Sequence, residues 1–268
     1  MRWKTLILLA ITALAGFPLS AKSDIVLGTA QDFAVLAGST VSNSGPTVIS
    51  GGNVGVSPGG TITGFPPGTV AAPFALHAGD AVATQAQNDL ATAYNAAAGL
   101  AHTQDLTGQD LGGLTLTPGV YFFSAATQLT GTLTLNDLGN PNAQFVFQTG
   151  STLTTAINSA VVTINGGSTP GQSVFWQVGS SATLGAGTAF EGHILAHDSI
   201  TLNNGASILN GSALALNAAV TLDTNHIDNG SSAVPEPSTM NLALLGGVLL
   251  GLAAFRKKWR ERRVSLPM

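Results

Sequence analysis

Short alternating stretches of apolar and small polar residues recur through most of the chain. Apolar runs such as "FVFQTG", "VFWQVG" and "HILAHD" are each followed by a shorter stretch, as in "SATLG" (181–185), "SITLN" (199–203) and "AVTLD" (219–223). Successive side chains of a strand point to opposite faces, so this alternation predicts strands with one buried face. Glycine and asparagine separate the strands, and the outline returns at intervals of roughly 20 residues. Such a period is typical of a β-solenoid or a propeller, in which each coil packs only against its neighbours.

Alignment of the repeats on their Thr-Leu pairs predicts which side chains form an outer face. The aligned pairs are Thr152-Leu153, Thr183-Leu184, Thr201-Leu202 and Thr221-Leu222, and Gln128-Leu129 and Thr40-Val41 fit the same column. Alternation places the leucines inward, and stacked coils would bring the outer side chains about 4.8 Å apart. The candidate face comprises Thr40, Ser42, Gln128, Thr130, Thr152, Thr154, Ser181, Thr183, Ser199, Thr201, Asn203 and Thr221. We expect Thr163, in "AVVTIN", to point outward on another face.

One segment departs from this pattern. "HAGDAVATQAQNDLATAYNAAAGL" (77–100) is rich in alanine, and Leu76, Ala83, Leu90 and Ala97 fall seven residues apart. This spacing predicts one apolar face of a helix over about 77–98, with Asp80 in its first turn and Gly99 at its end. A narrow alanine stripe can approach a sheet closely, so we expect the helix to pack beside the solenoid and to interrupt it in sequence.

The distribution of charge excludes several functions. All nine Lys and Arg lie near the two ends, and there is none between Ser23 and Phe255. Nucleic-acid binding requires basic side chains that neutralise phosphates, so the domain is not expected to bind nucleic acid or to clamp phosphates. The chain has no cysteine, so packing alone must stabilise it.

Both ends of the chain have the composition of processing segments. Residues 1–21 combine a basic start, an apolar run and a small residue, which predicts a secretory signal peptide rather than a membrane anchor. Residues 234–268 hold Pro235-Glu236-Pro237, an apolar stretch and an arginine-rich end, and this order resembles the PEP-CTERM sorting signal of Gram-negative bacteria. The resemblance implies an exosortase-type partner, and a plain C-terminal anchor is the alternative. The predicted working domain is 23–233, secreted or associated with the cell envelope.

Three candidate catalytic or metal sites do not withstand inspection. "GVSPG" (55–59) has the spacing of a nucleophile elbow, but Pro58 lacks the backbone N–H that an oxyanion hole would use after Ser57. His193 and His197 would lie about 13 Å apart on a strand, so they cannot share one metal, and Glu191 with His193 alone is a weak pair. The scattered acids Asp105, Asp110, Asp223 and Asp228 lack the spacing of calcium loops. We therefore expect no catalytic residue, no metal site and no cofactor.

The segments from about Asp24 to Asp228 closely resemble the microbial ice-binding protein family. The resemblance rests on "LGTAQDFAVLAGSTVSNSGPTVISGG", the alanine-rich helix, "DLGGLTLTPGVYFFS", "NAQFVFQTGSTLTTA" and "VFWQVGSSATLGAGTAFEGHILAHDSITLNNGASILNG". It implies a mostly β fold, a discontinuous right-handed three-faced β-solenoid with one long helix alongside. It also implies adsorption to ice through one flat face. Some members carry a Thr-Ala/Gly-x-Thr/Asn motif there, which "TAIN" (155–158) matches once.

Ice binding is therefore the function that the sequence predicts, by a monomer whose partner is the ice surface. The alternative for the threonine column is ordinary strand propensity on a solvent-facing sheet. The alternative for the protein is an extracellular structural or adhesive matrix protein that binds polysaccharide or a cell surface. Sugar binding usually uses exposed aromatic side chains, and Trp176 lies in an apolar strand while Trp3 and Trp259 lie in the end segments.

Overall fold

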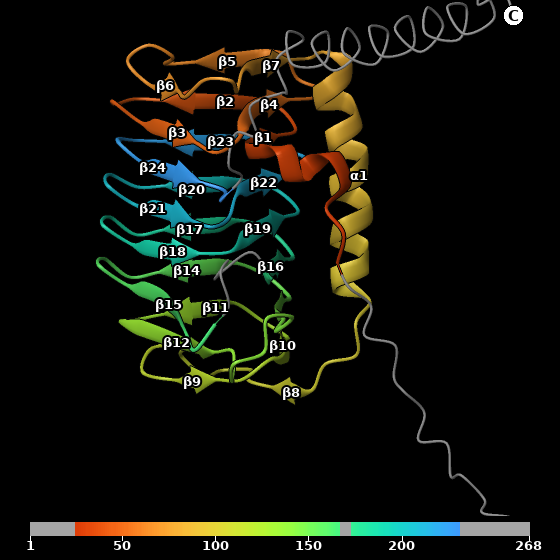
Figure 1. Cartoon of the computed structure of the whole chain (residues 1–268), viewed down its shortest axis with the longest axis vertical. Helices are drawn as coiled ribbons and strands as arrows, with labels where there is room; N and C mark the ends of the chain where they lie inside the picture. Colours follow the sequence, from red (N-terminus) through yellow and green to blue (C-terminus); the bar gives the residue numbers. More distant parts are fainter. Residues whose placement is uncertain (1–24, 167–172, 231–268) are drawn as a thin grey trace, which may run out of the picture.

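The computed structural model describes residues 25–166 and 173–230, so the predicted signal peptide and the C-terminal segment lie outside the described residues. The described chain forms three parallel β-sheets that run along one stack of coils (Figure 1). In spatial order, sheet A contains β7 (Leu76–Ala78), β4 (Asn53–Val56), β1 (Phe33–Ala37), β22 (Ala213–Ala215), β19 (His193–Ala196), β16 (Val174–Val178), β13 (Phe145–Thr149), β10 (Gly119–Phe123) and β8 (Gln104–Asp105).

The other two sheets complete each coil, since the chain passes from sheet A to sheet B to sheet C and back to sheet A. Sheet B contains β11 (Thr127–Leu129), β14 (Leu153–Thr155), β17 (Ala182–Leu184), β20 (Ile200–Leu202), β23 (Val220–Leu222), β2 (Thr40–Asn43) and β5 (Thr61–Thr63). Sheet C contains β6 (Thr69–Val70), β3 (Val48–Ser50), β24 (His226–Asp228), β21 (Ser207–Leu209), β18 (Ala189–Glu191), β15 (Ala160–Ile164), β12 (Thr132–Asn136) and β9 (Thr115–Leu116). The three-faced β-solenoid is thereby confirmed.

The solenoid is discontinuous in sequence. β1 near the start of the chain pairs with β22 near its end, where Val35 lies opposite Ala213, and β2 and β3 pair likewise with β23 and β24. The first coils therefore close one end of the stack, and the helix α1 (Ala81–Ala98) carries the chain back to the opposite end, where β8 and β9 begin (Figure 1).

The helix α1 covers the outer side of sheet A. Its N-cap Asp80 accepts a hydrogen bond from the Ala83 N–H at 2.9 Å, and the helix ends before Gly99. Its buried face is made of Ala83, Ala86, Leu90, Ala93 and Ala97. These side chains pack in one cluster with Phe175, Leu195 and Leu214 of sheet A, and the short alanines allow the close approach.

The start of the helix differs from the expectation. Leu76 lies in β7 and is 43% exposed, so it is not part of the apolar helix face. β7 pairs with β4, where Leu76 lies opposite Val54, and this ladder keeps the chain extended until the cap at Asp80. Within the described ranges, no helix is long and apolar enough to cross a membrane.

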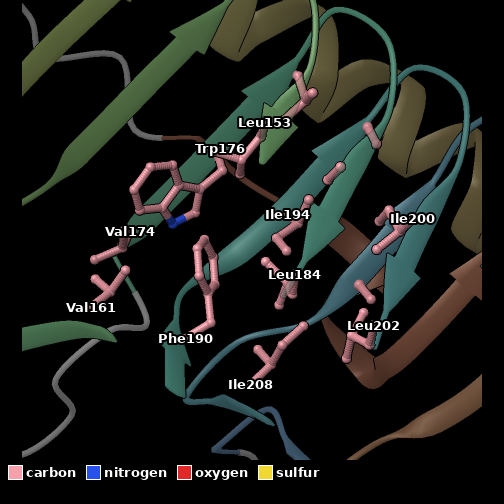
Figure 2. Close-up of a cluster of buried hydrophobic side chains, with 14 of the residues drawn as sticks. Leu153, Val161, Val174, Trp176, Leu184, Phe190, Ile194, Ile200, Leu202 and Ile208 are labelled. Atoms are coloured by element: carbon pink, nitrogen blue, oxygen red, sulfur yellow. The ribbon is translucent and has the colours of Figure 1, made fainter. Parts of the chain in front are cut away.

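Apolar side chains from all three sheets fill the interior of the coils. The rings of Phe147 and Trp176 stack with centroids 3.9 Å apart, and Tyr121 stacks on the other side of Phe147. The Trp176 indole N–H donates to the Glu191 carbonyl at 3.1 Å, which satisfies its one polar group. Figure 2 shows Trp176 together with Phe190, Ile194 and their neighbours inside the stack. This packed interior holds the outer faces rigid.

Candidate functional site

The outer side of sheet B carries a single column of small polar residues that runs along the stack. Paired registers place its members side by side on adjacent strands. Between them, alternation buries Leu129, Leu184, Ile200 and Leu222 in the core. In spatial order the column, here called the threonine column, is Gln128, Thr154, Thr183, Thr201, Thr221, Ser42 and Thr63.

The remaining predicted residues flank this column. Ser181 and Ser199 lie just before their strands, and their hydroxyls are hydrogen-bonded across neighbouring coils at 2.9 Å. Thr152 is half-buried just before β14, and Thr40 begins β2. On the other side of the column, Thr130 and Asn203 are exposed just after β11 and β20.

Two of the sequence alignments were wrong by two residues. Leu153 lies opposite Ala182, so Thr154 and not Thr152 lies beside Thr183. Likewise Thr221 lies beside Ser42 rather than Thr40. In the first case, the alignment placed Leu153 beside Leu184. In the observed register Thr155 takes that inward position instead, and it is 3% exposed. Its hydroxyl bonds the Thr188 hydroxyl at 2.8 Å and accepts from the Gly185 N–H at 2.8 Å, and these buried bonds favour the observed register.

The same contacts place the "TAIN" match at a corner of the solenoid. Thr155 points inward at the end of β14, and Asn158 has a φ of 56° in the turn that follows. The motif residues therefore lie between sheets B and C rather than on the outer side of sheet B.

Sequence reasoning missed the last strand of the face. β5 carries Thr61 and Thr63, both exposed, and Thr61 lies beside Thr40 while Thr63 lies beside Ser42. The alternating stretch "TIT" at 61–63 has the same outline as the aligned repeats and was the signal that could have revealed it.

The strands of sheet B contain no charged side chain. One acid, Asp110, lies opposite Gln128 in an isolated bridge just beyond β11, in line with the end of the column, and is held by local hydrogen bonds. Asp110 accepts from the N–H groups of Gly112 and Thr130 at 2.7 and 2.9 Å. Although burial opposes ionisation, these bonds lower the pKa of the Asp110 carboxyl, so it stays ionised beside the end of the column.

The other two faces are less uniform. Sheet A is covered by α1. Sheet C exposes larger apolar side chains, including Val48 and Val162, together with His226. Among the described sheets, only sheet B combines an uncovered surface with a line of small hydroxyl side chains, which runs from Thr154 to Thr63.

Sheet C also corrects the position of Thr163. It lies opposite the buried Leu135, and its hydroxyl donates to the Glu191 carboxylate at 2.6 Å. It is therefore half-buried rather than outward-facing, and its exposed neighbours on β15 are Val162 and Ile164. Burial raises the pKa of Glu191, more than the hydrogen bonds from Thr163 lower it, and the charge of Asp137 adds to the rise.

The residues weighed as catalytic or metal ligands have structural surroundings. Ser57 is buried and bonds the Thr84 hydroxyl of the helix at 2.9 Å. His193 is buried beside the Ser212 hydroxyl at 2.8 Å, whereas His197 is exposed beside Asp198. Among residues 25–166 and 173–230, no three His, Cys, Asp or Glu side chains are grouped as metal ligands.

The fold is a discontinuous β-solenoid. Its stacked coils form three parallel sheets, a helix covers one of them, and the strands of another, sheet B, are uncovered and carry no charged side chain. The chain belongs to the family described as Ice-binding-like, which matches residues 35–228. A second match, described as the PEP-CTERM protein-sorting motif, covers residues 233–258.

Similar proteins agree with this assignment. An ice-binding protein of Nostoc sp. (strain HG1) is 54% identical over 96% of this chain and 97% of its own length. One from Colwellia sp. is 33% identical over 76% of this chain and 83% of that protein. A crystal structure of an ice binding protein from an Antarctic biological consortium is 42% identical with a TM-score of 0.73, covering 84% of this chain and 96% of that one. The ice-binding protein of the Antarctic ascomycete Antarctomyces psychrotrophicus is 41% identical, also with a TM-score of 0.73, over 78% of this chain and 100% of that one.

Proposed function

We propose that the protein is an ice-binding protein that adsorbs to ice through the outer side of sheet B and thereby inhibits ice growth and recrystallisation. The observation that carries the assignment of the face is the threonine column, which extends over seven adjacent strands. Five of its seven members are threonine, and four of these, at positions 154, 183, 201 and 221, follow one another without interruption.

The column can order water because each threonine offers two kinds of group. Its hydroxyl bonds one water, and its methyl restricts the waters beside it as apolar groups do. Parallel strands repeat these groups about every 4.8 Å, so a patch of water is held in a regular arrangement. Ordered waters that bridge two surfaces are enthalpically nearly as good as direct hydrogen bonds. A charged side chain would bind water in its own geometry, and none stands on the strands of this sheet.

The experiment is ice growth in the presence of the purified, leaderless chain. Micromolar protein that is folded by circular dichroism should facet growing ice crystals and suppress the coarsening of ice grains. Round ice discs and unchanged grain growth would reject ice binding. A matrix or adhesive protein that binds sugars is less well supported, because no aromatic residue stands in the strands of sheet B and Trp176 is buried.

The proposal extends to how the protein is handled by the cell. The sorting motif supports export to the envelope of a Gram-negative bacterium, with an exosortase-type enzyme as the processing partner. We place the mature domain at 23–233 and the sorting segment at 234–268, and assign the domain no catalytic role and a monomeric state. Deleting 234–268 should leave ice activity intact, since the last described strand ends at Asp228. Loss of folding would show that the boundary is wrong, and size-exclusion chromatography tests the monomer.

A further inference from the structure

The point at which the chain leaves the domain lies on the edge opposite the candidate ice-binding face. We propose that the protein, held at the cell envelope by its C-terminal segment, acts as an ice adhesin that presents the threonine column away from the cell. This inference rests on the proposed function, because it concerns the direction in which the same face points.

The path of the coils defines the edge. Each coil passes through sheets A, B and C in turn, as in β16, β17 and β18, so the cross-section has three sides and three edges. In such a section, the edge where sheet C returns to sheet A lies opposite sheet B. β24 belongs to sheet C, and the chain runs from Asp228 to Gly230 beyond its end, at this edge.

Hydrogen bonds fasten the exit to the rest of the domain. Asn229 is 2% exposed, and its side-chain amide donates to the Gln31 carbonyl at 3.0 Å. The Gly230 N–H donates to the Asp228 carboxylate at 2.9 Å. Since Gln31 lies in the short helix η1 (Gly28–Asp32) that leads into β1 of sheet A, the two described ends of the chain meet at this edge. The attachment point is therefore rigidly placed relative to sheet B.

The exit also lies within the stack rather than at either end of it. In sheet C, β24 is flanked by β21 and β3, and in the same coil β23 carries Thr221 of the threonine column. Figure 1 shows β24 between the two ends of the stack, so a tether attached here leaves both ends of the column free. The domain would therefore meet ice along the whole length of sheet B, with the attachment behind it.

The tether is short. The sorting motif begins at residue 233, three residues after Gly230, and the apolar stretch begins at Leu242. Twelve residues span at most about 40 Å when fully extended. An attachment on sheet B itself with so short a link would hold the column against the surface, whereas an attachment on the opposite edge leaves it open.

The chain has no cysteine, so a single introduced cysteine gives one defined attachment point. We would prepare the leaderless chain as Ser231→Cys, next to the exit, and as Thr130→Cys, beside the threonine column. Each is first assayed free for ice shaping and then coupled to maleimide beads at equal density. Beads coupled through Ser231→Cys should be captured by a growing ice front at least about tenfold better than beads coupled through Thr130→Cys, because many correctly presented copies act together.

Each outcome is decisive. Failure of both free variants and the unmodified chain to shape ice would reject the proposed function itself. Active free protein with no capture through Ser231→Cys, or equal capture through both positions, would overturn the proposed orientation. In a Gram-negative host with the sorting machinery, cells that produce the full chain should adhere to ice and cells that produce Thr201→Tyr at equal surface abundance should not. Equal adhesion of the two kinds of cell, or protein found only in the medium, would overturn the proposal that the protein acts as an ice adhesin.

Discussion

Thr154 lies directly beside Thr183 on the neighbouring strands β14 and β17, although the sequence outline pairs Thr183 with Thr152. The observed pairing continues through Thr201 and Thr221, so four threonines stand in one unbroken line. A shift by two residues would have put Thr152, which lies just before β14 at the margin of the sheet, in the place of Thr154. The regularity of the proposed site therefore depends on a register that is set inside the solenoid, at Thr155.

Replacement of Thr183 or Thr201 by tyrosine should abolish most of the ice activity. The ring would project from the middle of the column and separate the flat surface from the ice. Since both sites are on the outer side and tyrosine is tolerated in strands, the free energy of unfolding should change by only about 0.5 kcal/mol. Grain-growth assays and thermal unfolding measure the two effects.

The matched control for these variants is Thr134→Tyr. Thr134 is a half-buried threonine in the middle of β12, on the outer side of sheet C. It should leave ice activity unchanged. Equal losses at Thr134 and Thr201 would mean that the wrong face was assigned, and no loss at Thr183 or Thr201 would reduce the column to ordinary strand propensity.

Gln128→Thr should increase ice activity. Gln128 is exposed beside Thr154 at one end of the column, where its longer side chain interrupts the series of threonines. Threonine at this position would extend the regular array by one strand, with a change in stability of about 0.5 kcal/mol or less. Ice-shaping assays over a concentration series compare the variant with the unmodified protein. Lower activity at equal stability would show that Gln128 itself contributes to binding.

Glu191→Gln should stabilise the protein at neutral pH. Burial raises the pKa of Glu191 above its ordinary value of 4.5, so the folded state holds the proton more tightly than the unfolded state. The stability linked to this group is therefore full below 4.5 and is lost as the pH rises through the folded pKa. Glutamine keeps an oxygen that can accept the hydrogen bonds from Thr163 without carrying charge.

Thermal unfolding of this variant should be measured between about pH 4 and pH 7. The difference in melting temperature between variant and parent should be small at the acidic end and should grow in favour of the variant toward neutrality. A variant that is destabilised equally at every pH would show that the carboxylate acts mainly as a hydrogen-bond acceptor.

Leu90→Ala should destabilise the contact between α1 and sheet A. Leu90 is fully buried in the cluster that joins the helix to the sheet, and removal of such a side chain typically costs about 2–5 kcal/mol. Val82→Ala on the same helix is the control, because Val82 is 49% exposed and its truncation should cost much less. Denaturant unfolding followed by circular dichroism measures both. Equal costs would mean that the helix does not depend on its apolar face.

The sequence by itself determined which residues of a strand point inward and where the helix lies. Alternation with a period of two and the alanine stripe are local patterns, so Leu184, Leu202 and Leu222 were placed inward correctly and Ala83 and Leu90 were placed on the buried helix face. The resemblance of the whole domain to a known family supplied the discontinuous order of the coils, which no local pattern contains.

Only the tertiary structure decided which residues stand side by side on neighbouring coils. Thr152 and Thr154 have the same parity in the strand, so alternation cannot choose between them, and the choice follows from the buried hydrogen bonds of Thr155. Thr163 was misplaced because its orientation depends on Glu191, which is 28 residues away in sequence. Parallel strands pair only after the chain has passed through a complete coil, so their register is set by contacts between distant residues and is not written in any one repeat.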